Sequence, residues 1–227
     1  MEHSFGIVSE GPTDQIVIQN ILIGLFDNFD LTAHIKFLQP LRDVTDEDYI
    51  KGRGGWFRVF EYCRSQYFID AFEQNDFIII QIDTDVCDQP NFDVKKNMEN
   101  GDLKSPEELI TDIKHKFEEI FLKEFGKEKY EAFANRIIYA ICHDEIECWL
   151  LPIYYTSSIK AATNNCIHKL NQVIFPTKEI YIDEKNKNNM VSNYWTISKP
   201  FMKHKTLRAC YHSNISLKLF IEDLLTK

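Results

Sequence analysis

Residues 5–14 read FGIVSEGPTD, and this stretch decides how the rest of the chain is interpreted. The apolar run at 5–8 predicts a short buried strand. Gly11 and Pro12 then predict a turn into a helix, because proline is favoured at the first helical position. Glu10 follows the strand and Asp14 lies in the first turn of the helix. We therefore expect two carboxylates at the carboxyl end of this strand.

A second apolar run also ends in acid. Residues 77–85 read FIIIQIDTD, an isoleucine-rich run typical of a central strand covered on both faces. Asp83 and Asp85 are two residues apart, so both side chains face the same side if the strand is still extended there. The carboxyl ends of parallel strands meet at one edge of a sheet, which is where open α/β sheets bind ligands. The two acidic ends are therefore expected to lie together.

A third apolar run, residues 136–142, is followed by Asp144, Glu145 and Glu147. We expect Glu147 at the same edge of the sheet as the other carboxylates. Asp144 and Glu145 are close alternatives, and any of the three acids can instead serve only to stabilise the start of the next helix.

Strand and helix patterns alternate along the chain and predict an α/β fold with a mainly parallel sheet flanked by helices. A further strand is expected at 33–39, and helices at 56–72, 105–121 and 158–174. We divide the chain into an α/β core, residues 1–152 with an insertion at about 40–75, and a mainly helical C-terminal extension, residues 153–227, packed on that core. The polar run at 183–189 is interpreted as a surface loop.

Composition narrows the classes of function. The chain has 227 residues, of which 44% are hydrophobic, and this is enough for a substantial core. A net charge of −9 argues against a broad basic surface for nucleic acid, so any such binding must be local, metal-mediated or shared with a partner. The six cysteines form no CxxC pair and are interpreted as reduced thiols. With no apolar stretch long enough to span a bilayer, we expect a soluble cytoplasmic protein.

Several carboxylates at one sheet edge suit Mg²⁺ or Mn²⁺, which prefer oxygen ligands and activate water in phosphoryl transfer. Simpler explanations exist for individual residues. Asp14 can interact with the helix dipole alone, and Asp83 and Asp85 can form turns with their own backbone. The joint pattern favours a metal site; its candidate ligands are Glu10, Asp14, Asp83, Asp85 and Glu147.

These motifs resemble the TOPRIM fold, the catalytic domain of topoisomerases, bacterial primases and overcoming-lysogenisation-defect nucleases. The resemblance covers roughly residues 4–152 and implies that Glu10, Asp83 and Asp85 bind divalent metal. Asp14, four residues after Glu10, is similar to the further acid of the nuclease branch. The segment 147–151, ECWLL, resembles one in small bacterial TOPRIM-like proteins, many of them encoded beside an ATPase in defence gene clusters.

A basic cluster at 199–208 stands out in an acidic chain. Lys199 or Lys203 could stabilise the charge that develops on a transferring phosphoryl group, and a solvated loop explains the cluster equally well. The glycines at 52, 54 and 55 lack the spacing of a phosphate-binding loop, so a plain turn is favoured.

The leading hypothesis is a Mg²⁺- or Mn²⁺-dependent nuclease acting on DNA or RNA, with a role in bacterial anti-phage defence. One alternative is an effector or binding subunit that is inactive alone and controlled by an ATPase partner. Another is a metal-dependent enzyme that processes nucleotides. The sequence leaves the oligomeric state open, a homo-oligomer included.

Overall fold

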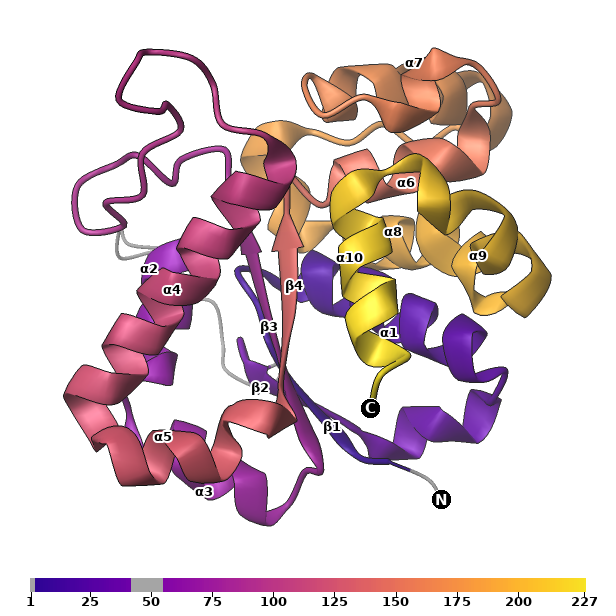
Figure 1. Ribbon diagram of the computed structural model, residues 1–227. Coiled ribbons are helices and arrows are strands. Elements are labelled where there is room, and N and C mark those ends of the chain that lie inside the picture. Colours follow the sequence, from indigo (N-terminus) through magenta and orange to yellow (C-terminus); the bar gives the residue numbers. More distant parts are fainter. Residues whose placement is uncertain (1–2, 42–54) are drawn as a thin grey trace.

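The structure, a computed structural model, describes residues 3–41 and 55–227. Its centre is a sheet of four parallel strands in the order β2-β1-β3-β4 (Figure 1). The predicted α/β fold with a parallel sheet flanked by helices is confirmed. The strands are β1 (Phe5–Val8), β2 (Ile35–Gln39), β3 (Phe77–Asp83) and β4 (Ile137–Cys142).

The side chains of β3 point alternately to the two faces of the sheet, and each face is covered by its own layer of helices. Ile78, Ile80 and Ile82 face one core, and Ile79 faces the other. Because side chains alternate along a strand, Gln81 and Asp83 lie on the same face as Ile79. The first layer holds α2 (Trp56–Cys63), α3 (Gln66–Asp70), η2 (Ala71–Glu73), α4 (Pro106–Phe125), α5 (Lys127–Phe133) and η3 (Ala134–Arg136).

The second layer begins with α1 (Pro12–Phe26), which is followed by η1 (Phe29–His34), and it includes most of the chain after β4. Figure 1 shows α1, α8, α9 and α10 on one side of the sheet, with α4 and α5 on the other. The C-terminal elements are α6 (Glu147–Tyr154), η4 (Ser158–Ala161), α7 (Cys166–Lys178), η5 (Glu184–Asn189), α8 (Val191–Ser198), η6 (Lys199–Met202), α9 (His204–Cys210), η7 (Tyr211–Ser213) and α10 (Ile215–Leu224).

The C-terminal helices share one hydrophobic core with α1 and the sheet. Buried residues of α6, α7, α8, α9 and α10 belong to the same cluster as Ile7 and Ile79. The indole of Trp149 stacks on Phe220 with ring centroids 5.3 Å apart and donates a hydrogen bond of 2.8 Å to Ser216 Oγ. Helix α6 also runs across residue 152, where the sequence suggested a boundary. The last third of the chain therefore packs as part of the core that positions the site.

The sequence patterns predicted the bounds of some helices correctly and those of others wrongly. The predicted helix at 105–121 is α4, and the expected capping box at Ser105 and Glu108 is present. The single helix predicted at 56–72 is wrong, because the chain turns after Cys63 and begins α3 at Gln66. The helix predicted to begin near 158 begins at Cys166, after a short 3-10 turn.

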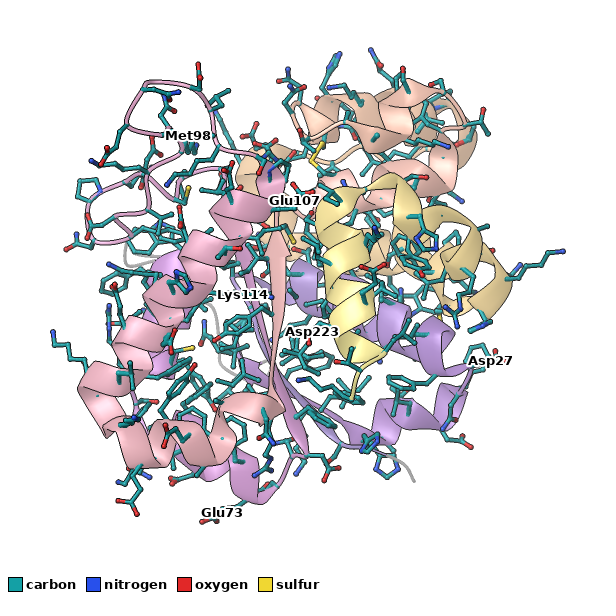
Figure 2. All side chains as sticks on the ribbon, viewed as in Figure 1. Asp27, Glu73, Met98, Glu107, Lys114 and Asp223 are labelled. Carbon is teal, nitrogen blue, oxygen red and sulfur yellow. A yellow bond between two sulfur atoms is a disulfide. The ribbon has the colours of Figure 1, made fainter. Side chains whose placement is uncertain are left out.

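One expectation about the cysteines is also wrong. Cys148 and Cys166 form a disulfide that joins α6 to α7, with their Cα atoms 5.0 Å apart. The other four cysteines are free and buried. Figure 2 shows the disulfide as a yellow bond near the tip of β4. Disulfides persist mainly in oxidising compartments, so this pair weakens the prediction of a cytoplasmic location. Within residues 3–41 and 55–227, no helix combines the length and apolarity needed to cross a membrane.

Replacing Gly24 with alanine tests the packing of the C-terminal elements on α1. A Cβ atom at Gly24 would lie 1.8 Å from the carbonyl oxygen of Phe201 in η6. Helix propensity alone would stabilise α1 by about 1 kcal/mol, whereas overpacking costs about 1–3 kcal/mol. We expect Gly24→Ala to lower the free energy of unfolding measured by urea denaturation.

The matched control is Gln19→Ala, on a part-exposed position of the same helix. A Gly24→Ala protein as stable as the control variant would mean that η6 does not pack on α1 as described.

Candidate metal centre

The carboxyl ends of β1 and β3 are joined through one buried glutamine. The backbone N–H of Glu10 donates to Gln81 Oε1 at 3.0 Å, and Gln81 Nε2 donates to Asp83 Oδ1 at 2.8 Å. In return, the backbone N–H of Asp83 donates to Glu10 Oε1 at 2.8 Å. This arrangement follows from the parallel register, in which Val8 pairs with Ile80. The structure thus places Glu10 and Asp83 side by side, as the sequence predicts.

Asp14 lies under the same edge, in the first turn of α1. Its Oδ2 accepts a 2.7 Å hydrogen bond from the backbone N–H of Gly11, which closes the turn after β1. Its Oδ1 is buried and has no hydrogen-bond partner in the described part of the chain. One oxygen of Asp14 therefore has a structural role, while the other is free to bind a ligand.

Glu147, at the start of α6, is the acid after β4 that points into the site. Its side chain is fully buried, and Oε1 accepts a short hydrogen bond from the hydroxyl of Tyr194 in α8. Its Oε2 is a second buried oxygen without a partner among the described residues. Glu145 instead accepts a 3.0 Å hydrogen bond from the backbone N–H of Ile167 at the start of α7. The sequence left open a choice among Asp144, Glu145 and Glu147, and these contacts favour Glu147 over Glu145.

A lysine that the sequence analysis did not select lies among these carboxylates. Lys187 Nζ is 3.4 Å from Glu147 Oε1, and the side chain is 25% exposed. Burial lowers the pKa of Lys187, but the carboxylates of Glu147, Asp83 and Asp14 outweigh burial and raise it above its usual value. The ammonium group is therefore charged at neutral pH. It balances part of the negative charge that three strand ends bring together.

Lys187 reaches the site from η5, within the polar run interpreted as a surface loop. The neighbouring Asn188 packs against the turn after β1, since a Cβ on Gly11 would lie 2.4 Å from Asn188 Oδ1. The side chain of Asp183 caps η5 by accepting from the backbone N–H of Lys185 at 3.1 Å. These contacts hold the segment against the acidic edge.

Burial perturbs the carboxylates strongly. It raises the pKa of Glu10 to about 8, with Asp14 and Asp85 adding to the shift and the hydrogen bond from Asp83 opposing it. Burial likewise raises the pKa of Asp14 to about 7, against the attraction of Lys187. The pKa of Asp83 is raised by burial and by the charge of Glu10. A site that holds several buried carboxylates so close together is stabilised by added positive charge.

Asp85 lies at the rim of the site. Strand β3 ends at Asp83, and the backbone N–H groups of Thr84 and Asp85 both bond to the carbonyl oxygen of Asp144 in a turn. The Asp85 side chain is exposed, and partial burial raises its pKa. The strand therefore ends before Asp85, so the extended backbone on which a shared face for Asp83 and Asp85 was predicted does not continue to Asp85.

The structure places Lys199 and Lys203 away from the carboxylates, so their predicted catalytic role is not supported by their positions. Lys199 Nζ lies 4.5 Å above the ring of Trp195, and both lysines are exposed. Their segment packs on Gly24, ten residues after Asp14 and about 15 Å further along α1 at 1.5 Å per residue. In Figure 2, Asp27 at this end of α1 lies far from Glu107, which is near the carboxyl ends of the strands. Gly52 and Gly54 lie outside the described residues, whereas Gly55 is the N-cap of α2, and a Cβ on it would lie 2.7 Å from Glu10 Oε2.

The residues present fit a hydrated Mg²⁺ ion better than a closed cage. The unpartnered buried oxygens of Asp14 and Glu147 are available as ligands. No three of the five predicted ligands bring one oxygen each within 4.8 Å of the others in the described chain. Mg²⁺ commonly uses only one or two carboxylates together with water and substrate oxygens, so this spacing suits it.

A different group does meet that distance, namely Asp144, Cys148 and Cys166. Its two sulfur atoms are joined to each other in the disulfide, so they are not thiolate ligands. Comparisons with protein-family models, with curated proteins and with solved structures found no match. The site is therefore interpreted from its own residues.

The raised pKa values predict how stability depends on pH. Without metal, folded Glu10 and Asp14 keep protons up to about pH 8 and 7, whereas in the unfolded chain they lose them near pH 4.5 and 3.8. The folded state therefore binds more protons between these values, so its stability falls as pH rises from about 5 to 8. We expect Glu10→Gln to weaken this fall and to raise Tm at pH 8 by at least about 2–4 °C, the shift for one kcal/mol at this length.

The measurement is thermal unfolding in chelator at several pH values. Glu73→Gln, on an exposed glutamate of the other layer, is the control and should behave as wild type. Identical pH profiles for wild type and Glu10→Gln would contradict the buried, proton-binding carboxylate.

Proposed function

We propose that this chain is a divalent-metal-dependent phosphoryl-transfer protein, most consistent with a nuclease that hydrolyses phosphodiester bonds of DNA or RNA. The main observation that supports this proposal is that carboxylates from the ends of β1, β3 and β4 lie around the ammonium group of Lys187. Oxygen ligands in this number suit Mg²⁺ or Mn²⁺, and buried groups with displaced pKa values are typical of functional sites.

In this proposal Glu10 and Asp83 would hold one ion, and the unpartnered oxygens of Asp14 and Glu147 would be available to a second. A metal bound there would polarise the scissile phosphate and lower the pKa of the attacking water. Asp85 is the one exposed acid among the five predicted ligands, so an arriving substrate would meet it first. Gln81 orients Glu10 and Asp83 through its two hydrogen bonds, and this keeps their oxygens in place without adding charge.

We assign to Lys187 the role that was predicted for Lys199 or Lys203. Its charge, beside Glu147, would offset the negative charge that develops on a phosphoryl group during transfer, and such placed charges are a large part of catalysis. Tyr194 holds the Glu147 carboxylate beside the ammonium group. The lysine also offsets carboxylate repulsion before substrate binds, so its removal affects both binding of metal and reaction rate.

The net charge of −9 supports a substrate contact confined to this site. We include in the proposal that a partner protein, such as an ATPase, supplies further contacts to nucleic acid. A role in anti-phage defence rests on the resemblance to small bacterial TOPRIM-like proteins alone.

Removing the ligands tests the reaction. We expect Glu10→Gln and Asp83→Asn to lower Mn²⁺-dependent cleavage of single- and double-stranded substrates by more than about 100-fold, because loss of groups that only orient ligands already costs about 10–100-fold. Glu73→Gln should cleave as wild type does. Equal rates for wild type and both site variants would show that any cleavage comes from elsewhere.

A second pair of variants decides which lysine acts. We expect Lys187→Ala to lower the rate of cleavage by about 100- to 1,000-fold, the usual effect of removing one stabilising group, while Lys203→Ala leaves it unchanged. Circular dichroism should report the same helix content for both proteins. A rate loss in Lys203→Ala but not in Lys187→Ala would reverse the assignment.

A further inference from the structure

A pocket of about 550 Å³ opens directly beside the acidic edge. Asp85 and Asp144 line it on the side of the sheet, and the start of α7 and residues 181–185 line it on the other. This volume is within the range of small-molecule sites. Because Asp85 belongs both to the pocket and to the rim of the candidate metal centre, whatever fills the pocket lies next to the reacting phosphate.

The charge of the lining limits what the pocket accepts. Five of its lining side chains are carboxylates and one is a lysine, Lys185. Such a surface repels a second phosphate group, so it does not serve as a track for a nucleic-acid backbone. It accepts hydrogen bonds readily, because carboxyl oxygens are acceptors. A neutral ligand that donates hydrogen bonds therefore suits it best.

The pocket also offers an aromatic face and a free amide. The ring of Tyr181 is 60% exposed and is held edge-on by Phe175, with centroids 6.3 Å apart. The amide side chain of Asn165, at the start of α7, makes no hydrogen bond with any residue that the structure describes. Aromatic rings stack on unpaired bases, and amide and carboxylate groups read base edges. These are the groups that recognise a nucleobase.

We propose that this pocket binds one unpaired nucleobase of the substrate, with its ring on Tyr181 and its edge at Asn165 and the carboxylates. The inference rests on the proposed function, because it assumes that a phosphate lies at Asp85. Carboxylates accept from exocyclic amino groups, so adenine, cytosine and guanine bind better than uracil or thymine. The substrate unit is either a free nucleotide or an unpaired residue of a strand, and paired bases of an intact duplex are excluded.

Binding of nucleosides tests the pocket without any reaction. Adenosine, cytidine and uridine are titrated into the full chain in chelator and followed by NMR chemical shifts. We expect adenosine and cytidine to bind more tightly than uridine. Tyr181→Ala should weaken adenosine at least about fivefold, the lower limit for loss of one aromatic stack. Tyr67→Ala removes another exposed tyrosine, in α3, and should change nothing.

Outcomes for the pocket and for the proposed function can be separated. Nucleoside binding that depends on Tyr181, in a protein that cleaves no nucleic acid, would support the nucleobase pocket and contradict the proposed nuclease activity. Cleavage that requires Glu10 would support the nuclease activity. If that protein binds no nucleoside, or if Tyr181→Ala binds nucleosides as tightly as wild type does, the nucleobase pocket is overturned. Free 5′-AMP that inhibits cleavage of a strand would identify a free nucleotide as a ligand of the same pocket. Preferential binding of spermidine, an amine attracted by the carboxylates alone, with no nucleoside binding would also overturn it.

Discussion

The attraction between Lys187 and the carboxylates around it is the interaction on which the candidate centre depends. Burial of several carboxylates near one another is unfavourable unless they are protonated or balanced by positive charge. Both protonation and positive charge contribute here. The pKa values of Glu10, Asp14 and Asp83 are raised, and the ammonium group of Lys187 lies beside Glu147. A purely structural protein gains little from such an arrangement. A protein that binds a divalent cation gains a site that the cation itself stabilises.

The fold explains why the acids meet. Strands β1, β3 and β4 are neighbours and run parallel, so residues that follow them share one edge of the sheet. Helices α1 and α6 begin at this edge and bring Asp14 and Glu147 with them. The C-terminal helices complete the arrangement, because Tyr194 in α8 and Lys187 in η5 both reach Glu147. The last third of the chain therefore shares both the core and the site.

The positions of Glu10, Asp83 and Glu147 could be predicted from sequence because each lies at the end of an apolar strand or after it, and parallel topology determines where strand ends lie. The position of Lys187 could not be predicted from sequence, because this residue belongs to a polar run without periodicity. Its position depends on the tertiary contacts of η5. The only feature of the sequence that pointed to Lys187 was its positive charge in an acidic chain. The basic cluster at 199–208 carries more positive charge and was therefore selected instead. The pairing of Cys148 with Cys166 was missed for the same reason, since it requires α7 to lie beside α6.

The most direct test of the metal centre is binding of Mn²⁺ followed by electron paramagnetic resonance. Figure 2 labels Glu73, an exposed glutamate at the opposite end of the molecule from the acidic edge, which makes it a suitable control position. We predict that wild type and Glu73→Gln bind Mn²⁺ and release Mn²⁺ when Mg²⁺ is added, and that Glu10→Gln and Asp83→Asn lose most of this binding. Equal Mn²⁺ affinity in all four proteins would contradict a metal centre at the ends of β1 and β3.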